Sequence, residues 1–150
     1  MSHELEETKV PDILLVEDNP GDVFLTRKCF EKAGQLVHLH HVNNGVKCLR
    51  FLRKEGEYAD VPSPVLIILD LNMPVMGGRE VLEEMILDKN ISHFPVIVLT
   101  TSTLEQDVSD MYRLRCSSYF QKPVDFDEFE KVIQSINHYW MSLAILPNNP

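Results

Sequence analysis

Short apolar runs that stop at a polar residue mark the predicted strands of this chain. The clearest run begins at Val65 and ends at Asp70, with prolines before it and Pro74 after it. A continuous apolar run of this length, bounded by turn residues, is typical of a strand buried on both faces of a sheet. Four further runs predict strands over residues 12–18, 36–42, 95–100 and 117–121. The run over 36–42 is the least apolar, which favours a position at the sheet edge.

Segments with helical spacing of apolar side chains separate these strands. Asn19 and Pro20 give the first helix an N-cap and a proline in its first turn. Ser102-x-x-Glu105 and Asp125-x-x-Glu128 read as capping boxes that open the last two helices. Strand and helix alternate five times along the chain, which predicts an α/β domain with a doubly wound parallel sheet and helices on both faces.

Composition limits the classes of protein that fit. The 150 residues suffice for one domain with a buried core, and we expect a flexible arm at 1–10, a domain at 11–146 and a tail at 147–150. The net charge of −9 disfavours binding to nucleic acid or anionic membranes. No apolar run approaches the roughly 18 residues that span a bilayer. Three widely spaced cysteines are expected to be thiols in a reducing cytoplasm.

Four of the five predicted strands end in a chemically useful side chain. The first ends at Glu17 and Asp18, and the others at Asp70, Thr100 and Lys122. Since the carboxyl ends of parallel strands share one edge, these groups are expected to meet in one cleft. Clustered carboxylates repel unless a cation such as Mg²⁺ compensates them. With Mg²⁺ and the lysine present, Asp70 can act as a nucleophile that forms an aspartyl-phosphate.

These strand ends and their flanking residues resemble the CheY-like receiver domain of two-component response regulators. The resemblance covers residues 11–142 and rests on four motifs in order: Ile13-Leu-Leu-Val-Glu-Asp-Asn19, Asp70-Leu-Asn-Met-Pro-Val-Met-Gly-Gly78, Val98-Leu-Thr-Thr101 and Tyr119-Phe-Gln-Lys-Pro123. It implies a flavodoxin-like fold with strand order 2-1-3-4-5.

The resemblance also implies a role for each matching residue. Asp70 would accept phosphate from a histidine kinase. Asp18, Asp70 and the Asn72 carbonyl would bind Mg²⁺ directly, and Glu17 would bind it through water. Thr100 and Tyr119 match the switch pair of the family, Lys122 matches the lysine that contacts phosphate, and the bond before Pro123 would be cis. At Gly77 the chain departs from the family, which often has Asp or Asn there. The resemblance therefore does not predict how rigid this loop is.

Two details resemble a narrower group, the single-domain regulators paired with cyanobacterial phytochromes. They are the Glu-Asp-Asn-Pro opening with Leu25 and Thr26, and the proline-rich insertion before the central strand. We therefore expect a stand-alone phosphoacceptor, not an enzyme, whose kinase is a phytochrome. Its signal would be a protein–protein contact.

Other functions remain open at this point. An aspartyl-phosphate phosphohydrolase typically carries a second carboxylate at the position of Asn72. A pure interaction module would have an idle acidic pocket. His38 and His40 share one face of an edge strand without a third ligand, which favours solvent exposure over a metal site. No P-loop or G-x-G-x-x-G motif supports nucleotide binding.

The end of the chain is more apolar than the last helix needs. Beyond Trp140 it continues with Met141, Leu143 and the segment 144–146 before Pro147. Exposed apolar surface often marks a partner contact, so we expect a homodimer through the fourth and fifth helices and the tail. Docking of the tail onto its own domain is the alternative.

Overall fold

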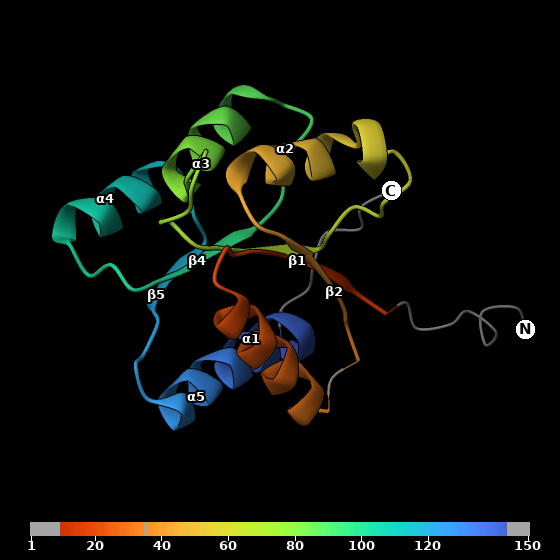
Figure 1. Cartoon of the computed structure of the whole chain (residues 1–150). Helices are drawn as coiled ribbons and strands as arrows, with labels where there is room; N and C mark the ends of the chain where they lie inside the picture. Colours follow the sequence, from red (N-terminus) through yellow and green to blue (C-terminus); the bar gives the residue numbers. More distant parts are fainter. Residues whose placement is uncertain (1–9, 35, 144–150) are drawn as a thin grey trace, which may run out of the picture.

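A parallel five-stranded sheet forms the centre of the molecule (Figure 1). The computed structural model describes residues 10–34 and 36–143, so most of the predicted arm and the tail lie outside the described residues. The strand order β2-β1-β3-β4-β5 confirms the predicted doubly wound, flavodoxin-like topology. The strands are β1 (Asp12–Val16), β2 (His38–Val42), β3 (Leu66–Leu69), β4 (Val96–Thr100) and β5 (Ser118–Gln121).

Helices cover both faces of the sheet, as predicted. In Figure 1, α1 and α5 lie on one face and α2 and α3 lie on the other. The helices are α1 (Pro20–Lys32), α2 (Gly45–Arg53), α3 (Gly78–Leu87), α4 (Glu105–Arg113) and α5 (Phe126–Asn137), with short helical segments η2 (Gly56–Tyr58) and η3 (His138–Leu143). Among the described residues, no helix has both the length and the apolar character that crossing a membrane requires.

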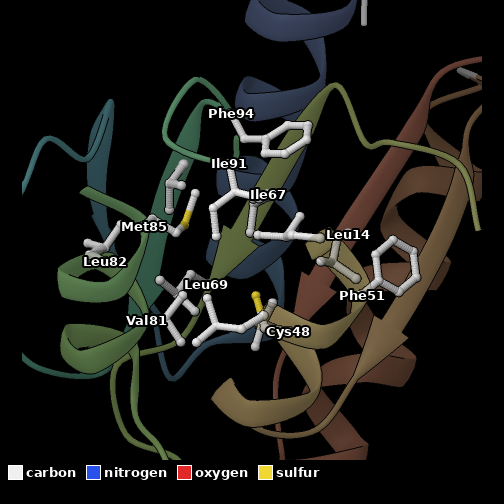
Figure 2. Close-up of a cluster of buried hydrophobic side chains, with 14 of the residues drawn as sticks. Leu14, Cys48, Phe51, Ile67, Leu69, Val81, Leu82, Met85, Ile91 and Phe94 are labelled. Carbon is white, nitrogen blue, oxygen red and sulfur yellow. The ribbon is translucent and has the colours of Figure 1, made fainter. Parts of the chain in front are cut away.

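The central strands are buried because each face of the sheet packs against helices. Alternate residues of β1 enter opposite cores: Leu14 packs with α2 and α3, whereas Ile13 packs with α1 and α5. Figure 2 shows the first core, in which Leu14 and Ile67 of the sheet lie between Phe51 of α2 and the side chains of α3. The two cores hold the strand ends in fixed positions.

The edge strand β2 is more exposed, as its composition predicts. Its His38 amide pairs with the Pro11 carbonyl, so the next residue, Leu39, turns its carbonyl away from β1. The Arg27 guanidinium donates a hydrogen bond of 3.0 Å to this outward carbonyl oxygen.

Two of the three predicted helix starts are confirmed. The Asn19 side chain accepts a hydrogen bond from the Asp22 amide at 3.1 Å, and Asp125 is the N-cap of α5. The prediction for Ser102 is wrong, because α4 begins at Glu105 with Leu104 at the N-cap position. The Ser102 hydroxyl instead donates to the Asp107 carboxylate at 2.5 Å, and its oxygen accepts a long hydrogen bond of 3.4 Å from the Leu104 amide, before the helix begins.

The loop between β3 and α3 is held against the end of β3. Val75 adopts a left-handed backbone conformation, with φ of 69°, inside a turn in which the Met76 amide bonds to the Pro74 carbonyl at 2.8 Å. A Cβ atom on Gly78 would lie 2.6 Å from the Asp70 carbonyl oxygen. At Gly77, a Cβ atom would lie 2.6 Å from the Leu71 carbonyl oxygen. The two glycines therefore permit a close approach of backbone to backbone at Asp70.

Candidate functional site

The carboxyl ends of four strands bring the predicted site residues to one edge of the sheet. The Asp70 amide bonds to the Val16 carbonyl at 3.0 Å, and the Lys122 amide bonds to the Thr100 carbonyl at 2.7 Å. These bonds extend the sheet by one residue beyond the regular strands. The side chains are thereby placed by the sheet itself, which is the most rigid part of the fold.

Three carboxylates form a group that fits a divalent cation. One oxygen from each of Glu17, Asp18 and Asp70 lies within 4.8 Å of the others. Glu17 and Asp70 are buried, and Asp18 is exposed. Hard cations such as Mg²⁺ bind oxygen ligands and retain waters, and the exposed side at Asp18 leaves room for waters. Asn72 lies beside this group, with its amide 3.3 Å from Asp70 Oδ1.

A buried lysine neutralises part of this acidic group. Lys122 Nζ lies 3.2 Å from Asp70 Oδ2 and also donates to Glu17. Its third bond, of 2.8 Å, goes to Asp22 on the first turn of α1. Asp22 was not among the predicted site residues. A signal was present, because the Asn19 cap starts α1 immediately after β1 and so places the first turn beside the strand end.

Burial and charge shift the pKa values of the two buried partners. Burial raises the pKa of Glu17 to about 7; the hydrogen bond from Lys122 opposes this effect, and the negative charge of Asp70 adds to it. Burial acts to lower the pKa of Lys122, but hydrogen bonds to Asp22 and Glu17 outweigh it and raise that pKa. The lysine is therefore a permanent cation, whereas Glu17 can carry a proton near neutral pH.

The Thr100 hydroxyl is buried and has no hydrogen-bond partner among the described residues. A buried hydroxyl without a partner costs about 1–3 kcal/mol, so it is uncommon in a folded protein. An anionic oxygen held near Asp70 would supply the missing acceptor. This orphaned donor fits the predicted contact between Thr100 and a phosphoryl group.

Tyr119, the other member of the predicted switch pair, is half-buried on β5. Its hydroxyl donates to the Ser102 carbonyl at 2.9 Å, and its amide donates to the Tyr112 hydroxyl at 3.2 Å. These bonds connect β5 to the loop before α4 and to α4 itself.

The predicted cis bond before Pro123 is wrong, since the described part of the chain contains no cis peptide bond. The trans form is intrinsically favoured even before proline, by about 0.5–1 kcal/mol. The Lys122 side chain reaches Asp70 from the trans backbone.

The histidines of β2 were predicted to face solvent, and this is wrong for His40. His38 Nδ1 and His40 Nε2 lie 3.2 and 2.9 Å from the same oxygen of Asp12. Asp12 stands opposite His38 in the parallel register, which brings all three side chains to one face. Among the residues that the structure describes, only the carboxylates at 17, 18 and 70 form a group suited to a metal.

Comparisons with known proteins identify the family of this chain. The model of the response regulator receiver domain family matches residues 13–134. Response regulator Rcp1 of Synechocystis sp. (strain PCC 6803) is 37% identical over 147 residues, covering 98% of this chain and 99% of Rcp1. The probable methanogenesis regulatory protein FilR2 of Methanothrix harundinacea is 34% identical and covers 86% of this chain and 83% of its own length.

Solved structures of receiver proteins superpose closely on this chain. The phosphorylated cyanobacterial phytochrome response regulator RcpA has a TM-score of 0.89 at 36% identity, covering 93% of this chain and all of RcpA. The Mn²⁺-bound form of Rcp1 has a TM-score of 0.88 at 36% identity, covering 92% of this chain and 99% of Rcp1. The chain belongs to the response regulator receiver domain family and is similar to phytochrome response regulators.

Proposed function

We propose that this protein is a stand-alone response regulator that accepts a phosphoryl group on Asp70. The observation that carries the proposal is the position of Asp70. It is buried, it forms a possible metal site together with Glu17 and Asp18, and it contacts the ammonium of Lys122. A carboxylate held between metal ligands and an ammonium can act as a nucleophile toward phosphorus, because both cations offset charge on the phosphoryl oxygens. We further propose that the donor is the phosphohistidine of a phytochrome histidine kinase. The similarity to RcpA and Rcp1 supports this choice of partner.

The residues supply the parts of a phosphoryl transfer. An Asp70 carboxylate oxygen attacks the phosphorus, the phosphorus–nitrogen bond of phosphohistidine breaks, and its electron pair returns to the imidazole. Mg²⁺ at Glu17, Asp18 and Asp70, with the Asn72 carbonyl, would neutralise charge on the phosphoryl oxygens. Lys122 and the Thr100 hydroxyl would donate to the same oxygens.

An enzyme that releases phosphate from external substrates is the second candidate, and the site does not favour it. Asn72 stands where such phosphohydrolases typically have a second carboxylate, and its amide group cannot act as a general acid or base. Turnover of a phosphomonoester such as p-nitrophenyl phosphate, with Asp70→Asn inactive, would support this candidate over ours.

Acetyl phosphate tests the phosphoacceptor role directly. Wild type incubated with acetyl phosphate and Mg²⁺ should gain one phosphate by intact mass, and omission of Mg²⁺ should prevent the gain. Asp70→Asn should gain none, whereas the matched control Asp127→Asn, on the first turn of α5, should behave as wild type. An unmodified wild type, which is the behaviour of an interaction module with an idle pocket, would refute the proposal.

We also propose that the signal leaves through the surface of α4 and α5, and that a second copy of the chain binds there in the cytoplasm. Large apolar side chains are exposed at the start of α4, on α4, at the start of α5 and in η3, namely Leu104, Tyr112, Phe126 and Tyr139. Tyr119 connects this surface to the loop that follows Thr100. The tail that we included in the dimer contact lies outside the described residues. Sedimentation velocity should show a dimer that Tyr112→Glu disrupts; a monomer at high concentration, with or without phosphate, would refute it.

A further inference from the structure

Asp22 contacts the site lysine from an element that supplies no other predicted site residue. Its carboxylate lies 2.8 Å from Lys122 Nζ, closer than the 3.2 Å that separates this ammonium from Asp70. In the part of the chain that the structure describes, no other cation forms an ion pair with Asp22. The Asn19 cap holds the backbone of Asp22, so the carboxylate is presented to the lysine by the helix start.

The three donors of Lys122 are all in use. An ammonium group has three N–H donors and no acceptor, and here they go to Glu17, Asp22 and Asp70. A phosphoryl oxygen on Asp70 can bond to Lys122 only if one of these bonds breaks. The exchange therefore requires one carboxylate to release the lysine.

Exposure decides which carboxylate releases the lysine most easily. The side chains of Glu17 and Asp70 are 4% and 8% exposed, whereas that of Asp22 is 26% exposed. A buried carboxylate that loses its partner stays unsolvated, which is costly. Water can reach Asp22 and replace the lost bond. Asp22 is thus the partner whose loss costs least.

We propose that Asp22 is a positioning residue that holds Lys122 in the unphosphorylated protein and yields it to the phosphoryl group. The inference rests on the proposed role of Asp70 as phosphoacceptor. Because Asp22 and the phosphoryl group compete for one ammonium, Asp22 weakens the phosphorylated state.

Beryllofluoride, a stable phosphoryl mimic, gives a direct measure of this competition. Its affinity at saturating Mg²⁺, followed by fluorine NMR, should rise about fivefold in Asp22→Asn, because the neutral amide holds Lys122 less strongly. Asp127→Asn removes an equal charge from the first turn of α5, away from Lys122, and should leave the affinity within twofold of wild type. Thermal melts of both variants show whether each is folded.

A double-mutant cycle separates the contact from a general charge effect. In a Lys122→Met background, Asp22→Asn should no longer raise the beryllofluoride affinity. A gain that persists there would overturn the inference, since the charge would then act without the lysine. Should Lys122→Met fail to fold, a crystal structure of wild type with beryllofluoride decides: Lys122 Nζ must have left Asp22. An intact Lys122–Asp22 bond would overturn the inference.

The outcomes also separate this inference from the proposed function. A wild type that binds no beryllofluoride and accepts no phosphate refutes the role of Asp70. A wild type that does both, with Asp22→Asn unchanged, refutes only the role of Asp22.

Discussion

The hydroxyl of Tyr119 donates a hydrogen bond to the carbonyl oxygen of Ser102, at 2.9 Å, and so ties β5 to the loop before α4. Tyr119→Phe removes this tie while keeping the ring. We expect a loss of about 1 kcal/mol in the free energy of unfolding and faster amide exchange at the start of α4. Hydrogen–deuterium exchange is the measurement, with Tyr58→Phe, between α2 and β3, as the control. Equal exchange in α4 for both variants would contradict the coupling.

The Thr100 hydroxyl should destabilise the unphosphorylated protein and stabilise the phosphorylated one. Thr100→Val removes the orphaned hydroxyl at nearly constant shape, so we expect the free protein to gain about 1 kcal/mol of stability. Thr100→Ala should still accept phosphate but lose the associated change in shape, whereas Thr100→Ser should retain it. Melting curves of the unphosphorylated proteins measure the change in stability. Sedimentation with and without beryllofluoride measures the change in shape. A Thr100→Ala protein with an unchanged phosphate-dependent response would refute the switch role.

Gly78 permits the backbone of α3 to approach Asp70. In Gly78→Ala the new Cβ would meet the Asp70 carbonyl oxygen at 2.6 Å, and backbone atoms must shift to relieve this contact. We expect a destabilisation of about 1–3 kcal/mol and slower phosphorylation by acetyl phosphate. In the comparison variant Gly21→Ala, the Cβ meets only the side-chain oxygen of the Asn19 cap, at 3.1 Å, so both quantities should change less than in Gly78→Ala. Equal rates for the two variants would show that the loop tolerates the shift.

The raised pKa of Glu17 predicts a pH-dependent stability in metal-free protein. Between the ordinary carboxyl pKa of 4.5 and about 7, the folded state binds a proton that the unfolded state has lost. The free energy of unfolding should therefore fall as pH rises through this range, by up to about 3 kcal/mol. Glu17→Gln should remove this part of the slope, and excess Mg²⁺ should oppose it. Urea titrations at several pH values measure it; identical slopes in wild type and Glu17→Gln would contradict the shift.

Most of the fold could be predicted because the apolar runs of β1, β3 and β4 fit only strands that are buried inside the protein. A strand that is apolar at every position must be covered on both faces, and alternation with helices then fixes a parallel sheet. The location of the site could be predicted from the parallel sheet, because parallel strands bring Glu17, Asp70 and Lys122 to one edge. Local caps were predictable where the side chain had no better partner, as at Asn19.

The failures have a common physical origin in side-chain contacts that the local sequence pattern does not show. Ser102 has the sequence of an N-cap, but α4 starts later, and the Ser102 hydroxyl bonds to the Asp107 carboxylate and the Leu104 amide. The Asp12 carboxylate forms a hydrogen bond with His40, whereas the pattern of an edge strand predicts that His40 faces solvent. Asp22 reads as an ordinary acidic residue in a first helical turn until the fold brings Lys122 to it. In each case the residue type was recognised and its partner was not.

The bond from Arg27 to the outward carbonyl of Leu39 bears on how copies of this chain can assemble. An open edge strand is a template onto which another molecule can add a strand, and folded proteins commonly block such edges. Here a guanidinium already occupies one acceptor of the exposed edge of β2. An incoming strand would have to displace it. The sheet is therefore not expected to continue from one molecule into the next, which leaves helical surfaces for specific assembly.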